Sequence, residues 1–375
     1  MTAARAGALL GLVGLAGGCP SRPPAASVAS AAEVGTLTQS PRIVGRDGPA
    51  SAVAWGMEVW TFGDTFLSLA NDEGTNFVSN TLATSQSALP AADAGSLTLE
   101  DRLDDAGAPD QFLQPTADEE AYDLAHRSLP DGGCDQSPCG GRWATWPATT
   151  VFDPADGGTA LTFYSLITAV PGDFNFSGVG QSIAVWSDFN RFPTRPEPGG
   201  CQPSPTLLFC ADEPAFGVFA AEVDGGLFAF GCSRSGLSFP CQLGMVPFPQ
   251  ALQRSAWSYW DGKGWSPELS RAQTLFDGAS IGGLFFDTYV GAWLAIYSRP
   301  LSNVVVFRTA PSLTGPWSDE GNLFAPDLKG SNGPTYDARP HPEFSQSGGR
   351  ILYVTFSRST GVFSSEIALV RVVLE

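Results

Sequence analysis

Hydrophobic and polar positions alternate in short runs along most of the chain, with turn residues between the runs. This period of two is typical of β-strands that bury one face. Lys and Glu, from which long amphipathic helices are built, are scarce. The pattern therefore predicts an all-β domain. Its clearest runs are Ser51–Trp55, Glu58–Phe62, Ala160–Ala169, Gln181–Trp186, Gly217–Val223, Leu227–Cys232, Trp257–Trp260, Gly282–Phe286, Trp293–Tyr297, Val304–Thr309, Ile351–Phe356 and Ile367–Leu374.

The main turn signals recur at a nearly regular spacing. After a first hairpin turn at Gly56-Met57 they lie near positions 157, 225, 291 and 348, at intervals of 68, 66 and 57 residues. Such an interval fits one four-stranded blade with long loops. We therefore expect a five-bladed β-propeller over residues 41–375. A two-sheet sandwich is the structural alternative, although it would not need this recurrence.

The first interval is longer because residues 86–140 look inserted. The stretch is rich in Asp and Glu, has little apolar periodicity and contains two cysteines. We predict an acidic surface excursion, placed over one mouth of the domain.

The N-terminus predicts export. Arg5 precedes an unbroken run of small and apolar residues, Ala6–Gly18, which ends at Cys19. The run is too short to span a bilayer, and it resembles a bacterial lipoprotein signal whose cysteine is acylated. We expect a signal over 1–18, an Ala/Ser/Pro-rich tether over 19–40, and membrane contact only through lipidated Cys19, in the cell envelope facing the periplasm or the exterior. Plain secretion with cleavage after Ala29-Ser30-Ala31 is the alternative.

The other six cysteines fall in three close pairs, and in an oxidising compartment short loops favour nearest-neighbour disulfides. Zinc is the weaker alternative, because there is no C-x-x-C pair and the chain has only two histidines. The predicted disulfides are Cys134–Cys139, Cys201–Cys210 and Cys232–Cys241.

A formal net charge of -18 limits the classes of partner. A field of this sign repels nucleic acid and anionic lipid surfaces. It is compatible with a neutral polysaccharide or oligosaccharide, although charge alone does not select one. We expect a monomer.

Two aspartates flank the first predicted hairpin. If Gly56-Met57 form its turn, the numbers of paired residues sum to 113, Asp64 faces Pro49, and Asp47 lies two residues farther along the same face. Such diagonal neighbours are ~7–8 Å apart. Carboxyl groups at this distance can divide the acid and base roles of glycoside hydrolysis. Alternatively, both aspartates simply stabilise turns and strand ends.

Several segments together resemble a bacterial family of exported five-bladed propellers, long classed as a domain of unknown function. Some members are endo-D-arabinanases, and the wider clan includes arabinanase and β-xylosidase propellers. The resemblance covers nearly all of Ile43 to Glu375. It implies that Asp47 and Asp64 match the catalytic candidates and that a furanoside polysaccharide such as arabinan is the substrate. The segments are Gly45-Arg46-Asp47-Gly48, Trp60-Thr61-Phe62-Gly63-Asp64-Thr65, Ala256-Trp257-Ser258-Tyr259-Trp260-Asp261-Gly262, Thr309-Ala310-Pro311-Ser312-Leu313-Thr314-Gly315-Pro316-Trp317 and His341-Pro342-Glu343-Phe344.

A second polar cluster, residues 336–343, precedes the last predicted blade strand. In a propeller, Arg339, His341 and Glu343 would line the same mouth as Arg46, and we predict that they bind substrate. His341 could orient a sugar, hold a water or, as in related propellers, help bind a central cation such as calcium. Otherwise we expect no cofactor and no metal. A buried, hydrogen-bonded histidine between two prolines is the structural alternative.

Further candidates lie in the middle of the chain. Trp143 and Trp146 could form a flat surface for sugar rings, although most tryptophans of all-β proteins are core residues. Asn80 could hydrogen-bond a sugar hydroxyl. Glu213 and Glu222 are weaker general-acid candidates.

One match to a hydrolase pattern is rejected. Gly278-Ala279-Ser280-Ile281-Gly282 fits G-x-S-x-G, but a nucleophile elbow must be followed by a helix, and a strand is predicted here. The sequence therefore leaves three hypotheses: a glycoside hydrolase, a non-catalytic lipoprotein that binds glycan or protein, and a scaffold that recruits partners through residues 86–140.

Overall fold

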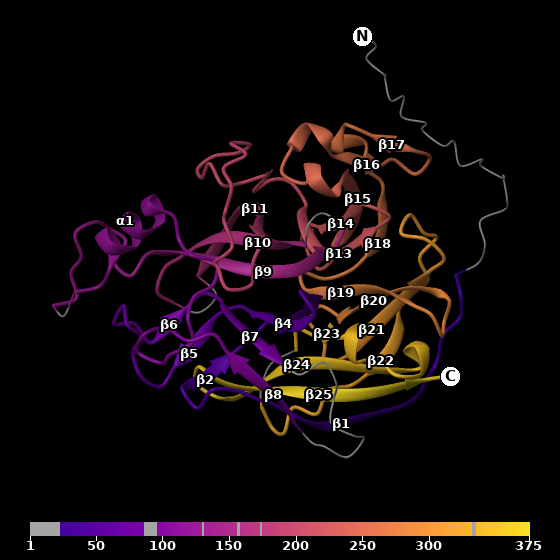
Figure 1. Ribbon diagram of the computed structural model, residues 1–375, viewed down its shortest axis with the longest axis horizontal. Helices are drawn as coiled ribbons and strands as arrows, with labels where there is room; N and C mark the ends of the chain where they lie inside the picture. The colour runs from indigo at the N-terminus through magenta and orange to yellow at the C-terminus, as the bar shows by residue number, and fades with distance from the viewer. Residues whose placement is uncertain (1–22, 86–95, 130, 156–157, 173–174, 332–334) are drawn as a thin grey trace, which may run out of the picture.

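The computed structural model describes residues 23–85, 96–129, 131–155, 158–172, 175–331 and 335–375, most of them in β-strands (Figure 1). This confirms the all-β prediction. The predicted signal and Cys19 lie outside the described residues. Among the helices of the described residues, none is long and apolar enough to cross a membrane.

The strands form successive antiparallel meanders, each opening with a hairpin. The first contains β3 (Ala50–Ala54), β4 (Met57–Phe62), β7 (Thr81–Ser85) and β8 (Ser96–Asp101). The second contains β9 (Arg142–Asp153), β10 (Thr159–Ala169), β11 (Phe176–Trp186) and β12 (Phe209–Cys210). The third contains β13 (Ala215–Val223), β14 (Gly226–Cys232) and β15 (Pro240–Pro247), followed by β16 (Ser258–Trp260), β17 (Trp265–Ser266) and β18 (Thr274–Asp277).

The fourth meander contains β19 (Gly282–Asp287), β20 (Ala292–Ser298), β21 (Val305–Ala310) and β22 (Gly321–Phe324). The fifth contains β23 (Arg339–Pro340), β24 (Ile351–Gly361), β25 (Ser364–Leu374) and the first strand of the chain, β1 (Val28–Thr38). A small sheet of β2 (Ile43–Arg46), β5 (Thr65–Leu67) and β6 (Phe77–Val78) lies beside the first meander. Short 3-10 helices span Phe248–Gln250, Arg254–Ala256, Leu269–Arg271, Pro342–Phe344 and Ser347–Gly349.

β1 joins the two ends of the chain and corrects the predicted tether. It pairs antiparallel with β25 and, from Thr36 to Thr38, parallel with β8 (Figure 1). Glu33 of β1 also accepts hydrogen bonds from the buried Arg358 guanidinium at 2.9 and 3.0 Å. The expectation of a flexible tether is therefore wrong for Val28–Thr38, because backbone pairing needs none of the large apolar side chains that this stretch lacks.

The core lies between neighbouring sheets. The first strands of successive meanders, β3, β9, β13, β19 and β23, contact one another in chain order. Buried apolar side chains such as Phe163, Phe216 and Trp257 fill the space between the second and third meanders. The first strand of each meander therefore lies beside the first strand of the next.

The predicted acidic insertion is shorter than expected. β8 lies inside residues 86–140 and is an ordinary sheet strand. The excursion beyond it contains α1 (Ala117–His126), whose N-terminus is closed by a capping box between Thr116 and Glu119. A buried ion pair of 2.5 Å between Glu119 and Arg195 ties the helix to the second meander.

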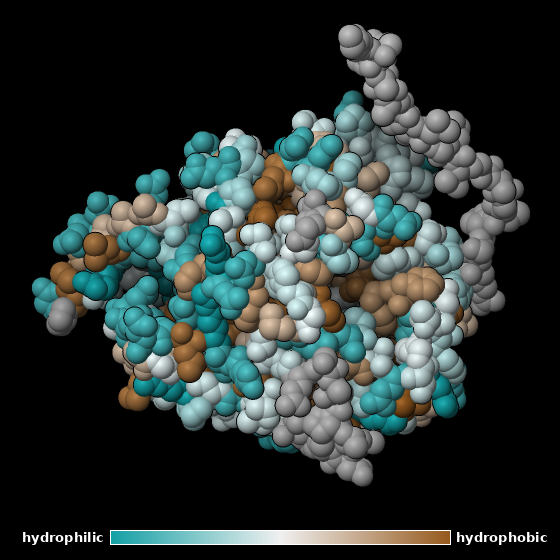
Figure 2. Space-filling view, viewed as in Figure 1, coloured by the Kyte–Doolittle hydropathy of each residue, from teal (hydrophilic) through white to brown (hydrophobic). Residues whose placement is uncertain are grey.

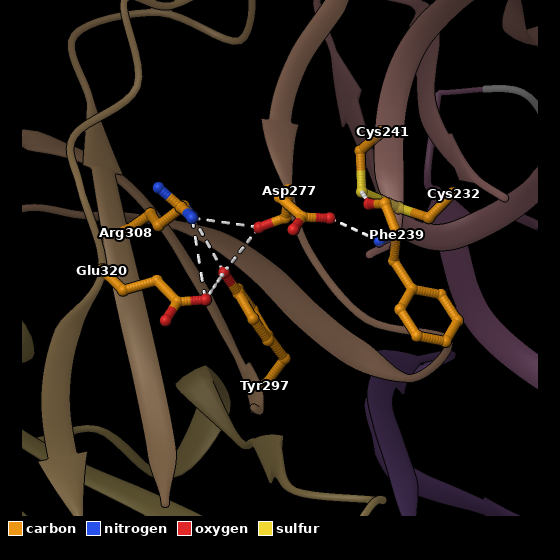
Figure 3. The surroundings of a disulfide bond; sticks show 7 residues. All are labelled: Cys232, Phe239, Cys241, Asp277, Tyr297, Arg308 and Glu320. Atoms are coloured by element: carbon orange, nitrogen blue, oxygen red, sulfur yellow. Dashed lines mark hydrogen bonds and ion pairs between the residues drawn. A yellow bond between two sulfur atoms is a disulfide. The ribbon is translucent and has the colours of Figure 1, made fainter. Parts of the chain in front are cut away.

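The three predicted disulfides, Cys134–Cys139, Cys201–Cys210 and Cys232–Cys241, are confirmed. Three disulfides indicate a non-cytoplasmic protein. Figure 3 shows the last of them beside the junction of the third and fourth meanders. There the Asp277 carbonyl accepts hydrogen bonds of 3.0 Å from both Tyr297 and Arg308, which fixes β18 against β20 and β21.

Candidate active site

The register of the first hairpin differs from the prediction by one residue. The turn is Trp55-Gly56, both with positive φ, and the paired residues of β3 and β4 sum to 111, not 113. β2 and β5 continue with the same sum, since Arg46 pairs with Thr65. In the gap between the two ladders, however, the Gly63 amide donates to the Asp47 carbonyl, which sets Asp64 one residue past the position that faces Asp47.

Glycines make room for this pair. The Gly63 amide donates to the Asp47 carbonyl at 2.9 Å, and a Cβ on Gly63 would lie 2.6 Å from Asp47 Oδ1. The Asp47 carboxyl group therefore lies directly over the Gly63 backbone. A side chain at position 63 would displace it.

Asp47 is held in its protonated form at neutral pH. Its side chain is half-buried, and protein atoms surround the carboxyl group. Burial, with the nearby charges of Asp64 and Asp337, raises the pKa of Asp47 to about 8, against the opposing effect of a hydrogen bond from the Tyr336 hydroxyl. Such a group can donate a proton at pH 7.

Asp64 has partners that favour its charged form. Its Oδ1 accepts a hydrogen bond of 2.7 Å from Trp146 Nε1 of β9. The pKa of Asp64 is nevertheless raised, because burial outweighs the lowering effects of the Trp146 hydrogen bond and the positive charge of Arg142. Two carboxyl groups with different environments can take different roles in one reaction.

A third carboxylate, Asp337, fixes the backbone under the pair. It is fully buried and accepts the amide of Gly48 at 3.0 Å and that of Ser357 at 2.9 Å. It thus joins the start of the first meander to the fifth. We named the cluster 336–343 from the sequence but assigned no role to Asp337 or Tyr336, because nothing in strand periodicity brings position 337 next to position 48.

His341 and Glu343 lie in a separate buried network between the first and fifth meanders. The His341 ring nitrogens are 2.5 Å from Ser51 Oγ and 2.6 Å from Thr355 Oγ1, and the Ser51 hydroxyl also donates to Glu343. The ring packs against Trp60, with centroids 4.5 Å apart. Because both nitrogens are occupied, His341 does not fit the role of a cation ligand.

Two predicted substrate contacts, Arg46 and Asn80, are engaged inside the protein. Arg46 is buried, 2.6 Å from Asp101, with its guanidinium over the Phe62 ring. Asn80 is buried and accepts the amides of Phe112 and Leu113, at 3.0 and 2.8 Å. These contacts pin the excursion and the small sheet, so we leave both residues out of the site.

Arg339 is also buried, and its Nη1 donates to the Gly282 carbonyl at 2.7 Å. Burial lowers its pKa to about 10, while Asp337 acts in the opposite direction. Arg339 therefore acts on the site through Asp337 and the backbone of the innermost strands.

The two tryptophans of β9 do not form one surface. They are three residues apart and so point to opposite faces of the strand. Trp146 reaches Asp64, and its ring meets Phe176 edge-on at 4.9 Å. Trp143 instead lines a cavity beneath α1. The expected flat platform is therefore wrong, although Trp146 does belong to the site.

The weaker acid candidates lie elsewhere. Glu213 pairs with Arg254 and accepts the Cys210 amide, and Glu222 accepts the Gly225 amide of the turn after β13. Ser280 precedes β19, a strand and not a helix, which confirms that the G-x-S-x-G match has no nucleophile elbow. Within the described residues, the one group close enough to hold a metal is Cys201, Cys210 and Glu213, whose two sulfurs form a disulfide.

Comparison with solved structures shows similarity of fold. A candidate hydrolase from Bacteroides ovatus is 13% identical with a TM-score of 0.54, over 89% of this chain and 86% of that one. An exo-β-1,3-galactanase from Phanerochaete chrysosporium is 10% identical with a TM-score of 0.48, over 92% of this chain and 64% of that one. An arabinanase from Bacillus subtilis is 9% identical with a TM-score of 0.42, over 87% of this chain and 96% of that one.

No curated protein matches the chain in sequence. A family model does match, over residues 171–363, and its description is domain of unknown function (DUF4185). Since this match covers more than half of the chain, the protein belongs to the DUF4185 family.

Proposed function

We propose that the protein is an exported glycoside hydrolase with a five-bladed β-propeller fold, acting on a furanoside polysaccharide such as arabinan. In this proposal Asp47 is the general acid and Asp64 the nucleophile. The observation that carries it is a neighbouring pair of half-buried carboxyl groups with raised pKa values, of which Asp64 alone has a tryptophan hydrogen bond and an arginine charge that favour its ionised form.

The propeller interpretation rests on the ring of innermost strands. Five meanders follow one another among the described strands, and the first strand of each contacts the first strand of the next. The ring is closed by the Gly48 amide, which donates to Asp337 ahead of β23. Asp47 and Asp64 would then lie at one mouth of the central axis.

The proposed reaction uses two carboxyl groups in two steps. Asp47 gives its proton to the glycosidic oxygen as the bond to the anomeric carbon breaks, while a carboxylate oxygen of Asp64 bonds to that carbon. Asp47, now ionised, takes a proton from water, whose oxygen displaces Asp64 and restores both groups. This retaining course needs carboxyl groups ~5–5.5 Å apart.

The substrate class rests on the motif resemblance and on charge. The segments around Asp47 and Asp64 resemble those of propellers that include endo-D-arabinanases, and the acidic surface favours a neutral polymer over an anionic one. Lipidation at Cys19 and a monomeric state complete the proposal.

The test is hydrolysis of D-arabinan and other furanoside polymers by wild type, Asp47→Asn and Asp64→Asn. Both variants should lose at least ~10²-fold in kcat. Asp212→Asn, at an exposed position between β12 and β13, should keep full activity. Full activity in both site variants would overturn the catalytic assignment. Saturable glycan binding without any product would instead support a non-catalytic binding protein.

The anomeric configuration of the first product separates the two possible courses. We expect retention, observed by NMR during the first minutes of the reaction. Inversion would mean that Asp64 activates water instead of attacking the sugar.

A further inference from the structure

A cavity of about 430 Å³ lies beneath α1, between the excursion and the small sheet. This volume is within the range of sites that bury small ligands. Six of the side chains that line it are aromatic, charged or amide groups that could contact a ligand: Phe77, Gln111, Glu120, Asp123, Arg142 and Trp143. The projection around α1 is mainly hydrophilic on the face shown in Figure 2.

Two backbone connections place this cavity next to the catalytic pair. β5 and β6 are antiparallel and pair Thr65 with Val78. The next position on this register sets Asp64 opposite Ser79, which lines the cavity. Neighbouring strands are ~4.8 Å apart. Thr145, also in the lining, precedes the tryptophan that binds Asp64.

Arg142 forms the wall shared by the two sites. Its guanidinium stacks over the Phe77 ring at 4.0 Å. Its charge lowers the pKa of Asp64 on one side and that of Asp123 on the other, in each case against the raising effect of burial. The cavity and the catalytic recess are therefore adjacent parts of one surface.

The lining has the composition of a sugar site. Phe77 and Trp143 are half-buried rings, whose exposed faces can pack against sugar C–H groups. Carboxylate and amide groups of Glu120, Asp123 and Gln111 can accept hydrogen bonds from hydroxyls. The acidic lining disfavours uronate or phosphate groups.

We infer that this cavity is a distal subsite for the same neutral glycan chain, binding sugar residues beyond the bond that is cleaved. The inference rests on the proposed function. Trp143 lies three residues from Trp146 along β9, ~10 Å away. The substrate must therefore be a chain that runs from the catalytic pair to the excursion, which favours internal cleavage of a polymer.

The test compares substrate lengths in one set of variants of the full chain. For Trp143→Ala we expect kcat/KM on long linear arabinofuranosyl oligosaccharides to fall about tenfold, with no change on a short aryl arabinofuranoside. Trp143→Phe should recover most of the loss, because it keeps an aromatic ring. Glu120→Ala, at an exposed position of α1, should lower the long-chain value about threefold without disturbing the fold.

The matched control is Trp265→Ala, which removes a partly exposed tryptophan remote from the cavity and should change neither substrate. Equal losses on long and short substrates for Trp143→Ala, or no loss in either cavity variant, would overturn the subsite.

Calorimetric binding of the same oligosaccharides separates this failure from that of the proposed function. Length-dependent binding that weakens in Trp143→Ala, without any hydrolysis by wild type, would support the subsite and contradict the enzyme. Hydrolysis whose length dependence is unaffected by both cavity variants would support the enzyme and contradict the subsite.

Discussion

The position and the pKa of the Asp47 carboxyl group depend on the residues around it. Its carboxyl group lies over Gly63, accepts a hydrogen bond from Tyr336 and is close to the charges of Asp64 and Asp337. Its usefulness as an acid depends on all of these contacts. Small substitutions beside Asp47 should therefore lower activity more than they lower the stability of the fold.

Gly63→Ala tests this at the single-atom level. The added Cβ would approach Asp47 Oδ1 to 2.6 Å and push the carboxyl group aside. We expect kcat/KM to fall by about 10²-fold, as for a reacting group displaced by about 1 Å. Gly264→Ala, whose Cβ would meet no atom within 4 Å, is the matched control and should be fully active. Equal activity in both variants would contradict the packing described for Asp47.

The raised pKa of Asp47 also predicts how stability changes with pH. The folded protein keeps this proton up to a pKa of about 8, whereas the unfolded chain releases it near 3.8. Between these values the folded state binds more protons, so this group destabilises the fold progressively as the pH rises.

Asp47→Asn removes that penalty. The melting temperature of the variant should match wild type below about pH 4 and exceed it increasingly up to about pH 8. Thermal denaturation followed by circular dichroism at several pH values measures the difference. A difference that stays constant across this range would show that Asp47 titrates normally in the folded protein.

The register of the first hairpin could not be predicted correctly from the sequence. Gly56-Met57 is the plausible two-residue turn between the two predicted strands, and a bulky residue such as Trp55 ordinarily disfavours positive φ. In the structure Trp55 accepts a φ of 52°. Its indole donates to the Gly158 carbonyl at 2.7 Å and packs against Phe152 and Trp186. These tertiary contacts outweigh the local preference, and no local pattern reveals them.

Among the elements, β1 has the greatest effect on how the sheets are connected. It pairs through its backbone with two strands at once, β25 on one side and β8 on the other. Its composition hides this role, since Leu37 is its one strongly buried large side chain. β9 was missed for a related reason, because its tryptophans were interpreted as a binding surface instead of strand residues.

Leu37→Ala should therefore be costly in a segment that looks like a linker. Leu37 is 4% exposed within a core cluster that includes Trp60 and Leu369. Truncating such a side chain destabilises a fold by about 2–5 kcal/mol. Urea denaturation should show this loss, while Ser30→Ala at an exposed position of the same strand should change little. If the two variants unfold at the same urea concentration, β1 is not part of the cooperative core.

For the whole molecule, the regular spacing of turns was the best guide. The predicted turns at Asp224-Gly225 and Tyr289–Gly291 each join the first two strands of a meander, as the spacing implied. What spacing could not give was the contact between distant loops, such as Gly48 with Asp337. Such contacts depend on how the sheets close around the centre.

This closure predicts that the chain tolerates new ends. The Glu375 amide donates to the Ser27 carbonyl at 3.0 Å, and Leu301 is 71% exposed between β20 and β21. A circular permutant that joins residue 375 to residue 27 and opens after Leu301 should unfold cooperatively, at a urea midpoint close to that of wild type. Deleting residues 1–38 should instead abolish cooperative unfolding, because it uncovers two sheet edges. Cooperative unfolding of the deletion variant, together with loss of cooperative unfolding in the permutant, would contradict the role of β1.

The position of β1 also sets the order of events during synthesis. Among the described strands β1 is made first, but its antiparallel partner β25 is made last. Until then the newborn chain carries an unpaired strand that other copies can capture, so intermediates of a large β protein are prone to aggregate. The pairing of β1 with β25 is therefore a late step, and any delay in translation after β8 has formed prolongs the interval in which that step can fail.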